Sequence, residues 1–137
     1  LNDNPPMIFE DGNQQRDFIH VKDVARACRQ ALEHTEISNE VFNIGSGNKY
    51  SVSEIAAKVS QALNKDHIQP EITGKYRVGD IRHCFADITK AQKLLGFNPR
   101  ISLEEGMEEL TEWLVNQVAE DHVEKATAEL NKRGLTV

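Results

Sequence analysis

The stretch DFIHVKDVARACRQAL (residues 17–32) changes from a strand pattern to a helix pattern within a few residues. Its first part, Asp17–Val21, is rich in β-branched and aromatic residues and predicts a short strand. Asp23 stands where an N-cap carboxylate would begin the following helix. The apolar face predicted for this helix, with Cys28 as a small core residue, consists of Val24, Cys28, Ala31 and Leu32.

A second strand-to-helix unit follows. Val41–Ile44 predicts a strand that ends at the glycine turn of residues 45–47. Ser51 and Glu54 have the spacing of a capping box. The apolar stripe of the helix behind them consists of Val52, Ile55, Val59, Ala62 and Leu63. The order strand–helix–strand–helix favours a parallel α/β arrangement, because parallel strands need a crossover between them.

The rest of the sequence predicts further helices. A short strand is expected at Glu71–Thr73, and Asp87 is expected to cap a brief helix that Gly96 ends. Ser102 and Glu105 repeat the capping-box spacing. The helix behind them is predicted to be amphipathic, with Leu103, Met107, Leu110, Leu114 and Val118 on one face and Trp113 beside it. A last amphipathic segment, Asp121–Arg133, completes a division into a domain (residues 1–118) and a C-terminal helical extension (residues 119–137).

Composition excludes several classes of protein. The net charge of −6 argues against a general nucleic-acid binder, which would present a basic face. No apolar run approaches the roughly 20 residues of a membrane span. Cys28 and Cys84 are too few for a disulfide scaffold, so the sequence favours the reducing cytoplasm. Because the chain begins at Leu1 rather than Met, we expect it to be a piece of a longer protein.

The glycine turn is the strongest false lead. Gly45 and Gly47 follow a predicted strand, as in a dinucleotide-binding fingerprint. That fingerprint needs a third glycine three residues after the second, and Tyr50 stands there. We therefore expect a tight turn and no cofactor site in this chain. The five histidines are scattered without helical pairs, so no metal site is predicted.

Three arginines are better candidates for a binding site. Arg16 stands just before a predicted strand, while Arg77 and Arg82 lie in an irregular stretch. Guanidinium groups at loop–strand junctions commonly grip phosphate oxygens with two parallel hydrogen bonds. The alternative is that they are solvated or paired with nearby carboxylates, namely Asp17, Asp23, Asp80 or Asp87. The residues alone leave both readings open.

Three stretches together resemble a known family: GNQQRDFIHVKDVARA (residues 12–27), EVFNIGSG (residues 40–47) and YRVGDIRHCFADITKAQKLLGFNPRISLEEG (residues 76–106). They are similar to the C-terminal part of the extended short-chain dehydrogenases/reductases, the NAD-dependent nucleotide-sugar epimerases and dehydratases. The resemblance implies a small C-terminal α/β substrate-binding domain of a Rossmann-type enzyme. In that family the N-terminal domain, absent from this sequence, binds NAD and supplies the catalytic residues.

The resemblance assigns roles to four residues. Arg16 resembles the arginine that clamps the substrate diphosphate from one side, and Arg77 resembles the second phosphate arginine. Asp80 resembles the aspartate that binds the ribose hydroxyls. Cys84 falls where the family has a residue lining the sugar pocket. Two cations facing a doubly anionic diphosphate, with a carboxylate accepting from a vicinal diol, form a coherent site.

Other matched positions imply structure or a loss of chemistry. Asp23 and Asn43 are expected to act as a helix cap and as a polar group buried at the end of a strand. The family's catalytic tyrosine has a lysine four residues later, whereas Tyr50 and Tyr76 have acidic residues at that spacing. The glycine-rich phosphate loop is also missing. No catalytic, cofactor-binding or metal-binding residue is therefore expected, and the chain alone should be inactive.

The resemblance implies the substrate-binding part of an NAD-dependent nucleotide-sugar 4-epimerase. GDIRHCFADITKA (residues 79–91) and ELNKRGL (residues 129–135) are most similar to 4-epimerases acting on dTDP- or UDP-hexoses, with dTDP-L-rhamnose as one candidate. A 4,6-dehydratase or a decarboxylase of the same family would use the same substrate wall. A stand-alone, non-catalytic nucleotide-sugar-binding or interaction module is the rival from another class. Expected partners are a UDP- or dTDP-linked sugar, the NAD-binding domain and, through exposed apolar surface, a second copy.

Overall fold

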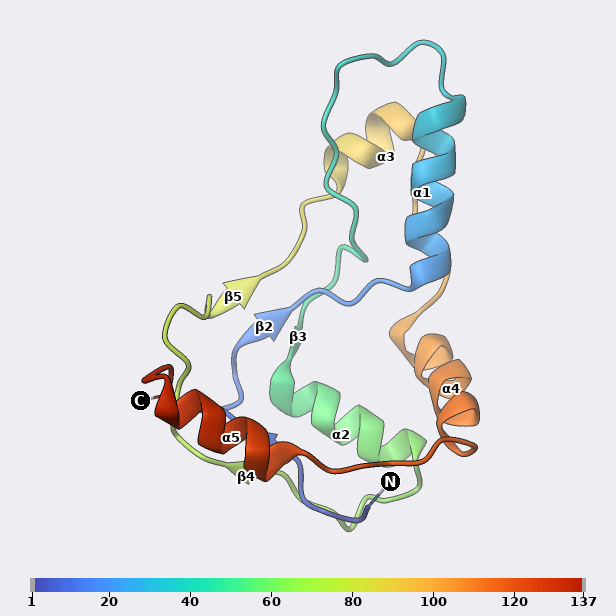
Figure 1. The fold of residues 1–137 in the computed structure, drawn as a ribbon. Coiled ribbons are helices and arrows are strands. Elements are labelled where there is room, and N and C mark those ends of the chain that lie inside the picture. The colour runs from blue at the N-terminus through green and yellow to red at the C-terminus, as the bar shows by residue number, and fades with distance from the viewer. Residues whose placement is uncertain (1, 137) are drawn as a thin grey trace.

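Short strands and peripheral helices make up this mixed α/β chain. The computed structural model describes residues 2–136 and is drawn in Figure 1. Its strands are β1 (Met7–Ile8), β2 (Gln15–Arg16), β3 (Tyr50–Ser51), β4 (Glu71–Ile72) and β5 (His83–Cys84). Its helices are α1 (Val21–Glu33), α2 (Val52–Ala62), α3 (Thr89–Leu95), α4 (Leu103–Leu114) and α5 (Val123–Lys132).

β2 is the central strand of the larger sheet, whose order is β3-β2-β5. It runs parallel to β5, with Arg16 opposite Cys84, and antiparallel to β3, with Arg16 opposite Tyr50. β1 and β4 form a separate parallel pair. The parallel pairs agree with the expected α/β class, while the antiparallel β2–β3 pair was not expected.

Two predicted strands were wrong. Residues 17–20 connect β2 to α1 without regular structure, and residues 41–44 form no strand. Phe42 and Ile44 instead pack against the α1–α3 core, while Val41 is 82% exposed. An extended segment becomes a strand only when a neighbour pairs with it, and residues 41–44 have no such neighbour in the described chain. The predicted strand at Glu71–Thr73 is confirmed as β4.

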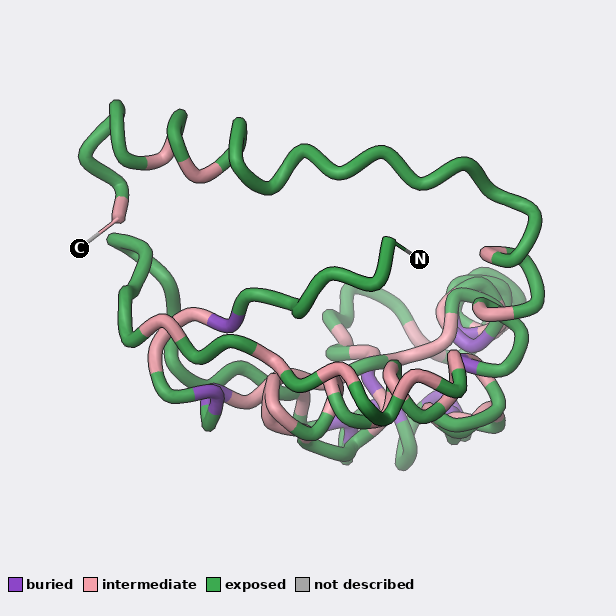
Figure 2. Tube along the Cα trace, turned by 90° about the horizontal axis from the view of Figure 1, so that it is seen from below, coloured by how far each residue is buried: buried purple, intermediate pink, exposed green. Residues whose placement is uncertain are grey.

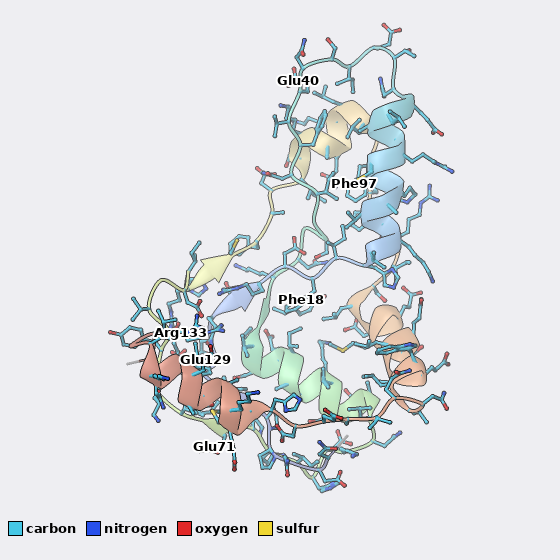
Figure 3. The ribbon with its side chains drawn as sticks, in the orientation of Figure 1. Phe18, Glu40, Glu71, Phe97, Glu129 and Arg133 are labelled. Carbon is cyan, nitrogen blue, oxygen red and sulfur yellow. The ribbon has the colours of Figure 1, made fainter. Side chains whose placement is uncertain are left out.

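The core is a small cluster between α1 and α3. Ala27 and Ala91, at most 1% exposed, let the two helices approach closely, and the Phe97 ring fills the space beside them (Figure 3). Gly96 ends α3 in the left-handed conformation, φ +63°, as expected. That turn directs Phe97 back onto the helix pair. Both predicted capping boxes, at Ser51 and at Ser102, are confirmed.

Most large apolar side chains lie outside this core. The predicted inner face of α1 was wrong, since Cys28, Ala31 and Leu32 are exposed and the buried residues of α1 are Asp23 and Ala27. Figure 2 shows α5 and the chain leading to it as a separate, mostly exposed layer. Apolar side chains at least half exposed include Val21, Leu32, Val41, Val78, Ile81, Phe85, Trp113, Val115 and Val118. The structure thus has the exposed apolar surface that was expected.

Asp23 is a buried tie between two segments rather than the expected N-cap. His20 caps α1 by accepting from the backbone N–H of Lys22. The Asp23 carboxylate, on a residue 2% exposed, accepts from the backbone N–H groups of Arg100 (2.8 Å) and Ile101 (3.0 Å). It also pairs with Arg26 at 2.5 Å. The first turn of α1 thus holds the chain that enters α4.

Asn43 was also assigned incorrectly, because it is exposed rather than buried. Its side-chain amide donates only a long hydrogen bond, 3.4 Å, to the carbonyl of Asp87. Asp87 lies one position before the N-cap residue of α3, Ile88, and accepts from the N–H of Thr89 at 2.9 Å. Asp87 therefore supports the start of α3 without occupying the N-cap position.

The glycine turn is closed by the carboxylate of Asp17. Asp17 accepts from the N–H of Ser46 (2.9 Å), the hydroxyl of Ser46 (2.5 Å) and, at longer range, the N–H groups of Gly47 and Ala86. A Cβ on Gly45 would overlap the Asp17 carboxylate and lie 2.6 Å from the Cβ of Ala86. The turn's N–H groups are thus occupied by an internal anion, which confirms a tight turn there.

The Asp23 tie predicts a defined pH dependence. Burial tends to raise the pKa of Asp23, but hydrogen bonds from Arg26, Ile101 and Arg100 outweigh it and hold the pKa below its ordinary 3.8. A lowered folded-state pKa stabilises the fold above the unfolded pKa, and this contribution is lost as pH falls through the folded pKa. Asp23→Asn should lower the free energy of unfolding at pH 7 by about 3 kcal/mol. Urea unfolding at pH 7 and pH 3 should show a smaller pH dependence for the variant; equal dependence would contradict the assignment.

The glycine turn predicts a steric effect at Gly45. Gly45→Ala should lower the free energy of unfolding by about 1–3 kcal/mol, because the methyl group has no room beside Asp17 and Ala86. Gly106→Ala is the comparison, since Gly106 lies in α4, where alanine is favoured by about 0.5–1 kcal/mol, and its Cβ would lie 3.1 Å from the His20 ring, a milder approach than at Gly45. Thermal unfolding followed by circular dichroism compares the two. Equal stability of Gly45→Ala and the wild-type chain would exclude the close approach.

Candidate functional site

Arg16 lies at the centre of the larger sheet, and its guanidinium donates three hydrogen bonds to backbone carbonyls. Its Nη1 donates to the carbonyls of Gln15 (2.8 Å) and Arg82 (3.0 Å), and its Nη2 donates to the carbonyl of Ile81 (2.6 Å). A guanidinium has five N–H donors. No hydrogen bond described for residues 2–136 uses the Nε–H or the second Nη2–H of Arg16. The edge formed by these two donors suits a two-pronged contact with an oxyanion.

Arg77 and Asp80 face each other across a tight turn. The N–H of Asp80 donates to the carbonyl of Arg77 at 3.2 Å. Gly79, the third residue of the turn, has φ +90°, which a glycine adopts readily and a type II turn requires. One oxygen of Asp80 accepts from both the Nε (3.0 Å) and the Nη2 (2.8 Å) of Arg77. We call residues 77–80 the Arg77 turn.

The pairing within the Arg77 turn leaves binding capacity on both partners. Asp80 uses Oδ2 alone, and Arg77 uses only Nε and one Nη2 donor among the interactions of the described chain. The Arg77 guanidinium also lies over the ring of Phe9, 5.5 Å from its centroid. Half of the Arg77 side chain and about a third of that of Asp80 remain exposed. The pair therefore orients a cation and a carboxylate oxygen toward solvent.

The three arginines differ in the partners that the structure gives them. Arg82 is paired with two carboxylates, Glu10 at 2.5 Å and Asp11 at 2.7 Å. Hydrogen bonding to Arg82 holds the pKa of Asp11 well below its ordinary value. Arg82 is thus the arginine that ties the β5 entrance to the chain between β1 and β2. Arg77 is likewise paired with a carboxylate, that of Asp80, whereas the hydrogen bonds described for Arg16 go only to backbone carbonyls.

Arg77, Asp80 and Cys84 lie in one segment, residues 77–84, and Arg16 contacts the backbone of that segment. Arg16 and Cys84 are register partners on parallel strands, so their side chains share a face of the sheet. The Nη2 of Arg16 contacts Ile81, the residue directly after Asp80. Tyr50, the β3 partner of Arg16, completes a row across the three strands. Sequence reasoning missed this position of Tyr50 because it depends on the β2–β3 register.

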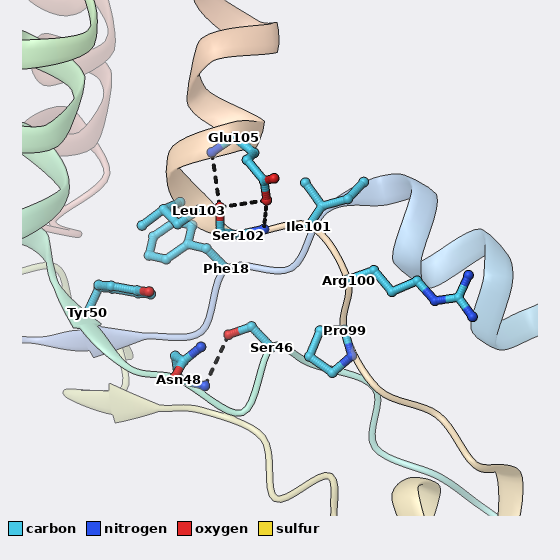
Figure 4. Close-up of a pocket in the computed structure, with 10 residues that line it drawn as sticks. All are labelled: Phe18, Ser46, Asn48, Tyr50, Pro99, Arg100, Ile101, Ser102, Leu103 and Glu105. Carbon is cyan, nitrogen blue, oxygen red and sulfur yellow. Dashed lines mark hydrogen bonds between the residues drawn. The ribbon is translucent and has the colours of Figure 1, made fainter.

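A small pocket lies next to this row. Its volume is about 240 Å³, and it is lined by Phe18, Ser46, Asn48, Tyr50, Pro99, Arg100, Ile101, Ser102, Leu103 and Glu105. Figure 4 shows the rings of Phe18 and Tyr50 on its wall and the Arg100 guanidinium directed away from it. The Ser46 hydroxyl accepts from the N–H of Asn48 at 3.1 Å at its edge. Sequence reasoning did not identify this pocket, and it contains none of the four expected residues.

Residues 2–136 contain no metal-binding cluster, no disulfide and no membrane-spanning helix. No group of three histidine, cysteine, aspartate or glutamate side chains is arranged to hold a metal ion. Both cysteines are free thiols. Within the described part of the chain, no helix has the length and apolarity needed to cross a membrane.

Comparison with known proteins gives one consistent family. The family model described as GDP-mannose 4,6 dehydratase matches residues 1–110. The dTDP-L-rhamnose 4-epimerase of Burkholderia thailandensis is 34% identical over 111 residues, covering 81% of this chain and 30% of that protein.

Solved structures agree with the family model. The UDP-glucose 4-epimerase of Thermotoga maritima, solved with UDP-glucose, has a TM-score of 0.75 and 36% identity over 82% of this chain and 35% of its own. The UDP-glucuronic acid 4-epimerase of Bacillus cereus, solved with NAD, has a TM-score of 0.65 and 34% identity over 77% of this chain and 33% of its own. The chain spans about a third of the length of the relatives it matches. It belongs to the GDP-mannose 4,6-dehydratase family and matches the C-terminal part of the nucleotide-sugar epimerases and dehydratases among the extended short-chain dehydrogenases/reductases.

Proposed function

We propose that this chain is the substrate-binding part of an NAD-dependent nucleotide-sugar 4-epimerase that acts on a UDP- or dTDP-linked hexose. The observation that carries the proposal is the unused donor edge of Arg16 beside the segment that contains the Arg77 turn and Cys84. Family membership supports it, since relatives that are 4-epimerases are about a third identical to this chain. That the longer protein catalyses 4-epimerisation is itself part of this proposal.

Each proposed contact uses an atom that the fold leaves available. The Nε and Nη2 of Arg16 and the outer donors of Arg77 would bind the oxygens of the diphosphate, with the short, strong hydrogen bonds of charged partners. The second oxygen of Asp80 would accept from the ribose hydroxyls. The small, exposed side chain of Cys84 would line the sugar side of the site and leave room for ring substituents.

The residues of this chain do not fit NAD. The only glycine turn that resembles a phosphate loop uses its N–H groups on the Asp17 carboxylate, so they cannot receive a pyrophosphate. We therefore assign the cofactor to the NAD-binding domain of the parent enzyme. On this proposal the chain by itself holds the substrate, has no catalytic residue and works in the cytoplasm, where its free thiols remain reduced.

Two other functions would use the same substrate-binding residues. A 4,6-dehydratase or a decarboxylase would share the diphosphate contacts and differ in residues beyond this chain. A stand-alone binding or interaction module would keep the contacts without any chemistry. Mixing this chain with the NAD-binding domain of a 4-epimerase relative separates the classes. Restored interconversion of UDP-glucose and UDP-galactose supports the epimerase, while binding without turnover supports the module.

The diphosphate assignment predicts the effect of removing Arg77. Arg77→Ala should weaken binding of UDP to this chain by about 1.5–3 kcal/mol, because a charge-assisted hydrogen bond is lost. Arg29→Ala is the matched control, since Arg29 also pairs with a carboxylate at the surface, that of Glu33 on α1. Isothermal titration calorimetry compares the variants. Equal weakening by both substitutions would point to a general charge effect and remove Arg77 from the site.

The ribose assignment predicts a selective effect at Asp80. If the substrate is UDP-linked and the free oxygen of Asp80 accepts from the vicinal diol, the wild-type chain should prefer UDP over 2′-deoxy-UDP; a dTDP-linked substrate, whose deoxyribose has only the 3′-hydroxyl, predicts no such preference. Asp80→Ala should reduce that preference toward unity, because the group that distinguishes the two sugars is gone. The ratio of the two dissociation constants is the readout. A ratio that stays the same in Asp80→Ala would assign Asp80 only to the orientation of Arg77.

A further inference from the structure

The C-terminal tail, Gly134–Thr136, returns from α5 to the Arg77 turn. Gly134 adopts φ +65°, and the N–H of Leu135 donates to the carbonyl of Leu130 at 3.0 Å, which ends α5 and reverses the chain. Thr136 then forms an antiparallel bridge with Arg77. The N–H of Val78 donates to the carbonyl of Leu135 at 3.0 Å. The tail therefore forms an isolated β-bridge with the backbone of the turn.

The Arg77 turn has few other attachments. Among the described residues, the Val78–Leu135 bond and the Arg77–Thr136 bridge are the backbone contacts that join residues 76–80 to the rest of the chain. On either side the chain is held by Lys75, whose carbonyl accepts from Glu10, and by Arg82. Residues 74–80 are exposed, and the glycines at 74 and 79 have open space around them. Such a segment is mobile unless another element orders it.

The element that carries the tail is itself attached to the start of the chain. The segment that leads to α5 receives hydrogen bonds from Asn4 to Asp121 (2.8 Å) and from Asn2 to the carbonyl of Ala119 (3.4 Å). α5 and the tail lie beyond residue 110, where the family model stops matching. This chain thus contacts its Arg77 turn with a segment that the family model does not include.

We infer that the C-terminal tail is a positioning element for the substrate-binding turn. The inference rests on the proposed function. By fixing the backbone of residues 77 and 78, the tail holds the Arg77 guanidinium and the Asp80 carboxylate in one arrangement before substrate arrives. A ligand then does not bear the conformational entropy cost of ordering them. Leu135 and Thr136 act through Arg77 and do not touch the ligand.

Hydrogen exchange tests the contact without any ligand. In a chain that ends at Arg133, protection of the Val78 amide should fall by about 2- to 10-fold, the value of one net hydrogen bond. Gly134→Ala should give a smaller fall, because alanine disfavours the left-handed turn. Gly96→Ala is the matched control, with the same conformation, open space and helix-terminal position on α3. Unchanged Val78 protection in the truncated, folded chain would overturn the inference.

Binding of UDP tests the consequence. Truncation at Arg133 should raise the dissociation constant by about 2- to 10-fold, with an unchanged thermal midpoint. In the Arg77→Ala background the same truncation should have a smaller effect, because only the placement of Asp80 is then left for the tail to order. Tighter binding after truncation would make the tail a blocking element and overturn the inference, as would additive effects of the two changes. If Arg77→Ala leaves binding unchanged, the proposed function fails, and Val78 exchange still decides whether the tail orders the turn.

Discussion

The carboxylate of Asp17 is the interaction on which the candidate site depends. It lies at the exit of β2 and gathers donors from the glycine turn and from the chain that follows β5. Its neighbour Arg16 occupies the central strand between β3 and β5. Because each of these strands spans only two residues, their ladders alone supply few hydrogen bonds. Asp17 holds the glycine turn and the chain after β5 next to β2. This arrangement sets the orientation of the Arg16 guanidinium and of its unused donors.

The buried carboxylate of Asp23 has the same role in the helical layer. Asp23 joins the first turn of α1 to the chain that enters α4, through two backbone N–H groups and Arg26. The apolar core between α1 and α3 is small, and many large apolar side chains remain exposed. Polar ties between distant segments therefore do much of the positioning within this chain. The exposed apolar surface is available for a partner domain or a second copy.

Local features were predictable from the sequence, and features that depend on distant partners were not. The capping boxes at Ser51 and Ser102 and the helix stop at Gly96 need only neighbouring residues, and all three are confirmed. The role of Asp23 depends on N–H groups more than 70 residues away, so an N-cap was predicted instead. The buried face of α1 was predicted incorrectly for the same reason, because it depends on segments distant in the sequence.

The candidate site shows the same division between local and distant contacts. The turn that joins Arg77 to Asp80 follows from Gly79 and a spacing of three residues, which the sequence shows directly. The difference between Arg82, which is paired internally, and Arg16, which keeps a free edge, follows from contacts with residues 65 to 72 positions away. Composition and spacing could not distinguish the two arginines. The contact between the tail and the turn also joins residues far apart in the sequence and has no local signature.

The central claim is that one face of this chain, around Arg16 and the Arg77 turn, binds a nucleotide sugar. Titration of the ¹⁵N-labelled chain with UDP-glucose, followed by two-dimensional amide NMR spectra, tests it most directly. Binding at this face should shift resonances that cluster at residues 15–17 and 76–85. Shifts confined to α2 and α4, or no shifts at ligand concentrations that saturate a solved relative, would contradict it.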